Sequence, residues 1–106
     1  MSRILLVRTT FGDPEEAARI ARLMIEDRFA ACASIAPTRS VYRWQGTIET
    51  DDETSVLFKT TPDRAAALRT AIGTLHSYDL PVIEAWEAEV DPAVAAWIDA
   101  GTTPVS

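Results

Sequence analysis

The sequence predicts a single α+β domain over residues 1–106, with the element order β-α-β-β-α-β. Two stretches, 6–16 and 57–64, share one plan: an apolar run, a basic residue, two threonines and a helix start that includes proline. The segment 40–49 between them alternates in side-chain character, which is typical of a strand. The length, with 47% hydrophobic and 25% charged residues, suits one globular domain.

The first half is expected to contain a buried strand around 6–10 and a helix over 14–28. Asp13 can cap the helix, and Pro14 stands at a position where the missing N–H costs nothing. Helical spacing places apolar residues on one face. These residues are Ala17, Ile20, Ala21, Met24 and Ile25. The helix should therefore pack on a sheet through this face.

The middle of the chain is expected to form two more strands. A small, apolar run over 30–35 predicts the second strand, with Pro37 as a break or bulge. The third strand is predicted over 55–60, after an acidic turn at 50–53. Alternation over 40–49 predicts that Tyr42, Trp44 and Ile48 share one face.

The C-terminal part is expected to add a second sheet-covering helix over 62–75, capped by Thr61, and a fourth strand over 80–90. A last short helix over 92–100 should pack Trp97 or Ile98 and end at Gly101. The polar tail, 102–106, is expected to be disordered. Together the elements predict a ferredoxin-like sandwich, with both main helices on one face of the sheet.

The hairpin between the second and third strands is long for so small a domain, and it should protrude. Tyr42 and Trp44 would be exposed on an isolated chain, and such apolar patches usually mark a contact surface. A closed ring of identical subunits would cover both the side chains and the free strand edge. The alternative is that the hairpin folds back on its own domain and buries Trp44.

Charge and composition narrow the function classes. The net charge is −6 and Lys59 is the only lysine, which disfavours nucleic-acid binding. The apolar run at 4–7 is too short for a signal-peptide core or a membrane span, so we expect a cytoplasmic protein without a membrane partner. A single cysteine, Cys32, excludes an intrachain disulfide.

Five phrases resemble the CutA family of divalent-cation tolerance proteins. They are Phe-Ala-Ala-Cys at 29–32, Ser-x-Tyr-x-Trp-x-Gly-x-Ile at 40–48, Lys-Thr at 59–60, His-x-Tyr-x-x-Pro at 76–81, and a tryptophan at position 97. Their order and spacing cover about residues 5–98. The chain departs from the family pattern at Ser77, where proline is usual, and at Val82, where glutamate is usual. Glu84, two residues on, is expected to reach the same space.

The resemblance implies a ferredoxin-like, PII-like homotrimer linked to divalent-metal tolerance, with copper binding in some members. It implies no required cofactor; Cu(II) or another divalent cation is the expected ligand. The candidate ligand cleft consists of Trp44, Lys59, His76, Tyr78 and Glu84. The sequence also leaves open a PII-like sensor of a small anionic metabolite at intersubunit clefts.

Two residues are candidate metal ligands. His76 is the sole imidazole, and imidazole suits copper and zinc, but a histidine at a helix end also caps backbone carbonyls. Cys32 could bind metal or take part in redox chemistry, but a cysteine between alanines is often a small buried hydrophobe. Catalysis would rest on His76 and Tyr78 alone, without a nucleophile motif or a phosphate loop. We therefore predict that the protein is not an enzyme.

Overall fold

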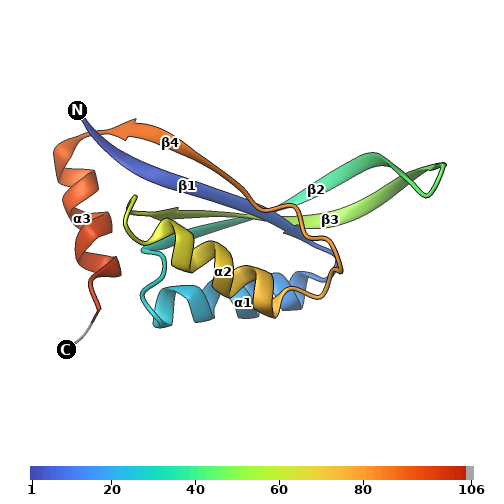
Figure 1. Cartoon of the computed structure of the whole chain (residues 1–106), viewed down its shortest axis with the longest axis horizontal. Coiled ribbons are helices and arrows are strands. Elements are labelled where there is room, and N and C mark those ends of the chain that lie inside the picture. The colour runs from blue at the N-terminus through green and yellow to red at the C-terminus, as the bar shows by residue number, and fades with distance from the viewer. Residues whose placement is uncertain (105–106) are drawn as a thin grey trace.

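The computed structural model describes residues 1–104 and confirms the predicted α+β fold. Its elements are β1 (Ser2–Phe11), α1 (Pro14–Glu26), β2 (Cys32–Trp44), β3 (Thr47–Thr60), α2 (Ala65–Leu75), β4 (Glu84–Val90) and α3 (Pro92–Thr102). The four strands form one antiparallel sheet in the order β2-β3-β1-β4. Helices α1 and α2 lie side by side on one face, and the β2-β3 hairpin extends well beyond them (Figure 1).

The two main helices begin differently. At α1, the Asp13 carboxylate accepts a hydrogen bond of 3.1 Å from the Glu15 N–H, as the sequence predicts, and Pro14 occupies the first turn. The helix ends two residues earlier than expected, because Arg28 adopts a left-handed φ of 61°. Helix α2 begins at Ala65 rather than at residue 62, since Thr61 accepts from the Arg64 N–H in a preceding turn.

The core lies between these helices and the sheet. The strands contribute Val7, Phe11, Val56 and Phe58, all fully buried. The helices contribute Ala17, Ile20, Ala21, Met24, Leu68 and Ile72. From Val7 in β1 and from Thr54 in β3, the buried residues occur at every second position, which leaves the intervening side chains on the opposite face. We call that second surface the open face of the sheet.

The hairpin corrects two sequence predictions. The chain reverses at Gln45 and Gly46, both with positive φ, so residues 50–53 belong to β3 and form no turn. The two-residue loop pairs Trp44 with Thr47 and Arg43 with Ile48. Directly paired residues share a face of an antiparallel sheet. Ile48 therefore lies on the face opposite to Trp44, and the prediction that the two share a face is wrong.

Two strand boundaries also differ from expectation. Strand β2 runs through Pro37 without a break, because β2 is an edge strand and the missing N–H removes no ladder hydrogen bond. Strand β4 begins at Glu84 rather than at residue 80. The preceding residues, 77–83, form an irregular loop that joins α2 to β4 and shapes the candidate site.

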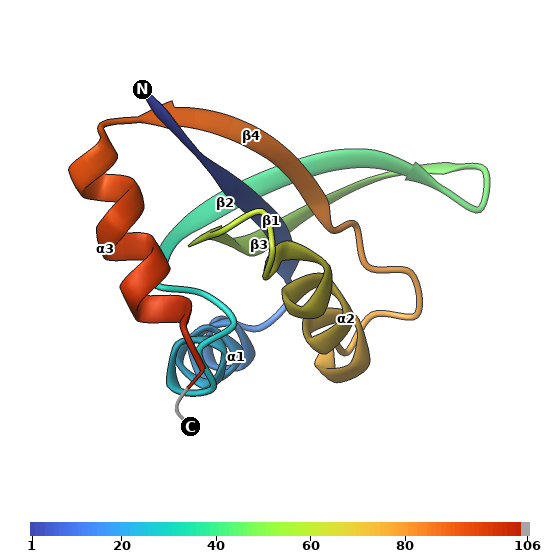
Figure 2. The ribbon, with the colours of Figure 1, turned by 60° about the vertical axis from the view of Figure 1, so that its left-hand side comes forward.

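The last helix covers one end of the open face. Ile4 lies three residues from Val7, hence on the opposite face, and its burial places α3 over this end of the sheet. Figure 2 shows α3 and α2 on either side of the sheet. Of the two predicted anchors, Ile98 is buried and Trp97 is exposed.

Helix α3 is longer than predicted. Gly101 lies inside it, where a Cβ would come within 2.8 Å of the Ala31 Cβ, so the glycine permits a close approach rather than ending the helix. Thr102 is buried, contrary to the prediction of a disordered tail at that position. Residues 105–106 of the predicted tail lie outside the described part of the chain.

Candidate functional site

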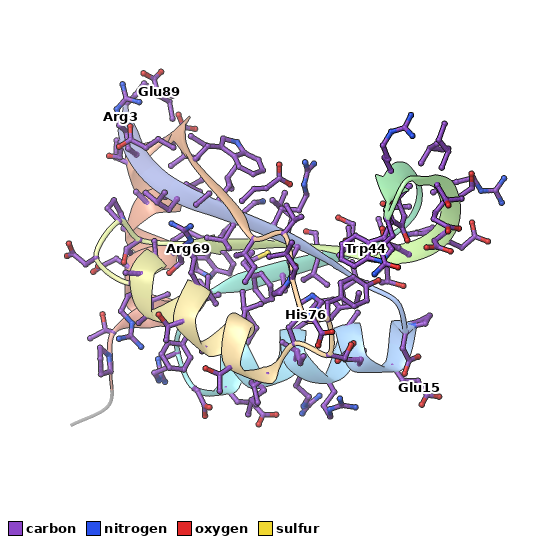
Figure 3. The ribbon with its side chains drawn as sticks, turned by 45° about the vertical axis from the view of Figure 1, so that its right-hand side comes forward. Arg3, Glu15, Trp44, Arg69, His76 and Glu89 are labelled. Atoms are coloured by element: carbon purple, nitrogen blue, oxygen red, sulfur yellow. The ribbon has the colours of Figure 1, made fainter. Side chains whose placement is uncertain are left out.

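A pocket of about 630 Å³ opens between the hairpin and the 77–83 loop. The open face of the sheet forms one wall, and the loop that follows α2 forms the other. The lining residues are Thr10, Ser40, Tyr42, Trp44, Glu53, Ser77, Tyr78, Asp79, Leu80 and Val82. Three of these are aromatic, and the two charged ones are both acidic. Figure 3 shows Trp44 on the hairpin and His76 in the same part of the molecule.

His76 fixes the loop to the sheet. Its Nδ1 accepts a 3.1 Å hydrogen bond from the Tyr78 backbone N–H, which can only donate. In the neutral ring the proton is therefore on Nε2, which donates to the Thr10 carbonyl oxygen at 2.8 Å. The ring also stacks on Phe11, with centroids 4.4 Å apart. Both ring nitrogens are thus engaged in holding the first residues of the loop.

Ser77 adds a second attachment. Its hydroxyl donates a 2.8 Å hydrogen bond to Oε1 of Glu16, a buried carboxylate on α1. Proline, the usual family residue at this position in the resemblance above, has no hydroxyl and could not make this bond. Ser77 therefore anchors the loop to α1 through its hydroxyl.

Glu53 is the best-connected carboxylate in the pocket. The Tyr78 hydroxyl donates to its Oε2 at 2.6 Å. Burial alone would raise the pKa of the Glu53 carboxyl, yet hydrogen bonds from Ser40, Tyr78 and Thr10 hold that pKa below its usual value of 4.5. Burial and the bond to Glu53 in turn raise the pKa of Tyr78 well above its ordinary range. The pocket thus holds an ionised carboxylate beside a neutral phenol at neutral pH.

The outer half of the hairpin is acidic on the open face, whereas its arginines lie on the other face together with Asp52. Register places Glu49, Asp51 and Glu53 on the open face, in the same rows as Tyr42, Ser40 and Thr38. The Tyr42 hydroxyl donates to Asp51, and this bond is the main cause that raises the pKa of Tyr42 to about 12. Both arginines of the hairpin, at positions 39 and 43, alternate onto the other face.

The predicted cleft residues fall into two groups. Trp44 and Tyr78 line the pocket, and His76 holds the backbone of Tyr78. Lys59 and Glu84 lie outside the pocket lining, farther along the open face. The Arg8 guanidinium pairs with the Glu84 carboxylate at 2.9 Å, so Glu84 does not take the place of the glutamate that Val82 replaces.

The two candidate metal ligands are also apart. Cys32 is half-buried on the open face, in one row with Lys59, Leu6 and Trp86. His76 contacts Thr9 and Thr10 farther along β1. Within residues 1–104 no group of three or more His, Cys, Asp or Glu side chains is arranged to hold a metal ion.

The sequence analysis does not place Glu53 in the cleft, because it predicts an acidic turn over residues 50–53. The Gln-Gly pair at 45–46 carries the signal that locates it, since a glycine in a two-residue hairpin loop fixes the register. Counting from that loop puts Glu53 on the face of Tyr42 and Trp44. Trp86 was also missed, although it lies two residues from Glu84 and therefore on the same face of β4. The Arg8 guanidinium lies 5.6 Å from its ring centroid.

Comparison with known proteins decides the family. A model of the family described as CutA1 divalent ion tolerance protein matches residues 5–101. The chain belongs to the CutA family.

Several CutA proteins resemble this chain closely. The divalent-cation tolerance protein CutA of Pyrococcus horikoshii is 38% identical over 80 residues, which cover 76% of this chain and 78% of the relative. The crystal structure of CutA from Xylella fastidiosa superimposes with a TM-score of 0.91 at 36% identity, covering 96% of this chain and all of the other.

A third CutA structure, described as the periplasmic divalent cation tolerance protein from Archaeoglobus fulgidus, has a TM-score of 0.90 at 32% identity and covers 96% and 100% of the two chains. In the present CutA chain, none of the helices in residues 1–104 is long and apolar enough to cross a membrane.

Proposed function

We propose that this CutA-family chain acts as a homotrimeric, non-catalytic protein that binds divalent cations weakly, copper foremost. The support comes from its match to the family over residues 5–101 and from relatives whose names refer to cation tolerance and to no catalytic activity. A net charge of −6 adds a general attraction for cations. Without a cluster of three ligands in residues 1–104, a closed site is disfavoured and binding should be weak.

The assembly proposal rests on the apolar side chains of the open face. Tyr42, Trp44 and Trp86 are 40–49% exposed, and no helix of residues 1–104 covers either face of the outer half of the hairpin (Figure 1). Burial of such side chains against further copies would stabilise the hairpin, and a cyclic arrangement would leave no free copy of the surface.

Light scattering tests the assembly. We expect a particle of three times the 11.6 kDa chain mass at micromolar concentration. Trp44→Glu should reduce the mass toward that of one chain, because an unpaired charge in an apolar contact costs several kcal/mol. The exposed Trp97→Glu on α3 is the matched control and should leave the mass unchanged. A stable monomer of the parent chain would refute the assembly proposal.

Copper binding is proposed to involve His76 first, with Cys32 and the carboxylates of the hairpin as the alternatives. Imidazole is the best copper ligand in this chain, but both nitrogens already make hydrogen bonds to Thr10 and Tyr78. A copper ion must therefore replace one of these bonds, which is a second reason to expect weak binding. The same requirement predicts that copper loosens the 77–83 loop.

Calorimetry with Cu(II) compares the parent with His76→Ala, Cys32→Ser and Glu53→Gln. We expect His76→Ala to remove most of the heat and the other two variants to retain most of it. If the heat of Cu(II) binding is lost in Cys32→Ser or Glu53→Gln instead, that residue is the copper ligand. Copper uptake no greater than that of an unrelated protein of equal net charge would end the metal-binding proposal.

A sensor of a small anionic metabolite is the second candidate. Its support is Lys59, which lies on the open face and forms no ion pair among the described residues, whereas the neighbouring Arg8 is paired with Glu84. Thermal-shift measurements with nucleotides and carboxylates would favour this function if they stabilise the parent more than Lys59→Gln.

We also propose that the protein works in the cytoplasm, although the Archaeoglobus fulgidus relative is described as periplasmic. The support is the single cysteine of the sequence, Cys32, which leaves no intrachain disulfide of the kind that oxidising compartments favour. Fractionation of the native host with an antibody to this chain tests the location, and recovery in a periplasmic or secreted fraction would refute it.

A further inference from the structure

We propose that the pocket between the hairpin and the 77–83 loop binds a small organic ammonium ion, with the Glu53 carboxylate as its counter-charge and the rings of Tyr42, Trp44 and Tyr78 as its walls. This site is separate from the copper site proposed at His76 and does not depend on it. Tyr42 and Trp44 also belong to the proposed contact between copies, so the assembled protein is the form that is tested. It goes beyond the proposed function in the class of ligand and in the residues that contact the ligand.

The charges of the pocket favour a cation. Its two charged lining residues are Glu53 and Asp79, and Asp51 lies next to it through its bond to Tyr42. The arginines of the hairpin point to the opposite face, as the register requires, so neither neutralises the pocket. An anion in this pocket would face the carboxylates of Glu53 and Asp79 and no cationic lining residue, which disfavours phosphates and carboxylic acids as ligands.

The size and the aromatic content favour an organic cation over a metal ion. A hard divalent cation needs six or more oxygen ligands at 2–2.6 Å, and residues 1–104 provide no such cluster. A cavity of about 630 Å³ is of the size that holds a small molecule. Aromatic rings attract alkylammonium groups through their quadrupoles, and this attraction strengthens where water is excluded.

The wall residues are held in place before any ligand arrives. The Tyr78 phenol bonds to Glu53, its backbone bonds to His76, and Ser77 bonds to Glu16 on α1. A Cβ on Gly12 would come within 3.2 Å of the Tyr78 hydroxyl, so the glycine leaves the space in which this ring sits. A site with fixed walls loses little conformational freedom on binding, which raises affinity for its ligand.

The first test uses the full-length protein in buffer with EDTA, so that metal binding cannot contribute. Tetramethylammonium chloride is titrated while the indole N–H signals of the three tryptophans are followed by NMR. We expect a saturable shift of the Trp44 signal, with Trp86 and Trp97 changing little. Tert-butanol, a neutral molecule of similar size, should bind at least tenfold more weakly. Equal binding of the two probes, or no shift at Trp44, would overturn the proposal.

The second test compares two neighbouring carboxylates of β3. Glu53→Gln removes the charge inside the pocket, whereas Asp52→Asn removes one on the opposite face, where Asp52 pairs with Arg39 at 3.0 Å. Both variants change the net charge equally. We expect Glu53→Gln to weaken tetramethylammonium binding at least tenfold and Asp52→Asn less than twofold.

Equal losses in the two variants would mean general electrostatic attraction and would overturn the proposal. Light scattering and circular dichroism confirm that both variants are assembled and folded. If Glu53→Gln does not fold, the proposal is tested by the first experiment alone, which compares the binding of tetramethylammonium and tert-butanol to the parent protein. Failure of these tests leaves the copper calorimetry unaffected, so the two proposals can fail separately.

Discussion

The body of the domain and the outer half of its hairpin are built from the same two strands but are stabilised differently. In the body, β3 buries Val56 and Phe58 completely under the helices. Beyond Thr54 the strand pairs only with β2, and its residues are mostly exposed on both faces. Val41 and Ile48 are 68% and 63% exposed. The hairpin is therefore held by its ladder and turn rather than by a core, which suits a segment that contacts other molecules.

The largest expected effect tests this contrast directly. Phe58→Ala should lower the free energy of unfolding by about 3–5 kcal/mol, because it leaves a cavity in the core. Val41→Ala on the hairpin should change it by no more than about 0.5 kcal/mol. Urea denaturation of both variants measures the two values. A cost of several kcal/mol for Val41→Ala would show that another chain covers this part of the hairpin.

Two glycine substitutions should change stability in opposite directions. Gly46 has a φ of +81° and open space around it, so Gly46→Ala should destabilise the protein by about 1 kcal/mol through backbone strain alone. Gly73 lies inside α2, where an added Cβ would meet the Ile83 Cδ1 at an ordinary 3.8 Å. Gly73→Ala should therefore stabilise by about 0.5–1 kcal/mol. Thermal unfolding of the two variants measures the direction of each change in stability. No change in Gly46→Ala would contradict the proposed backbone strain at this turn.

The smallest effect concerns pH. The pKa of Glu53 is lowered in the folded protein, so this carboxylate contributes stability that is fully present above its unfolded pKa, near 4.5, and is lost as the pH falls through the folded value. The parent should therefore be more stable than Glu53→Gln at pH 7, and the difference should shrink below pH 4.5. Tyr78→Phe should reduce the pH dependence of stability, because it removes the hydroxyl that donates a hydrogen bond to the Glu53 carboxylate. A constant difference from pH 7 to pH 3 would contradict this origin.

Local signals in the sequence were sufficient for the body of the fold. The cap at Asp13 and the apolar spacing of Ala17, Ile20 and Met24 predicted α1, and the structure confirms both. The hairpin was predicted less well, because residues 50–53 carry no apolar side chain and are typical of an acidic turn. The strand register of the hairpin depends on the positive φ angles of Gln45 and Gly46. A pattern of polar and apolar residues does not predict these angles.

The candidate site was predicted only in part for a related reason. Trp44 and Tyr78 were expected in one cleft, and the pocket brings them together. Lys59 and Glu84 were expected in the same cleft, but sheet register puts both elsewhere on the open face. The pocket is completed by a loop that has no periodic pattern, and its course depends on the bonds of His76 and Ser77 to residues more than 60 positions away.

The central position of β1 has a consequence for synthesis. Strand β1 is synthesised before its partners. It pairs with β3, about 50 residues later, and with β4, about 80 residues later, and Ile4 lies at the end of the sheet that the last helix covers. Contacts this distant in sequence form slowly. A nascent chain that lacks its last 25 residues would expose one long edge of β1 and an uncovered isoleucine, a template for pairing with another chain. Co-translational chaperone binding should therefore be strongest just before β4 emerges.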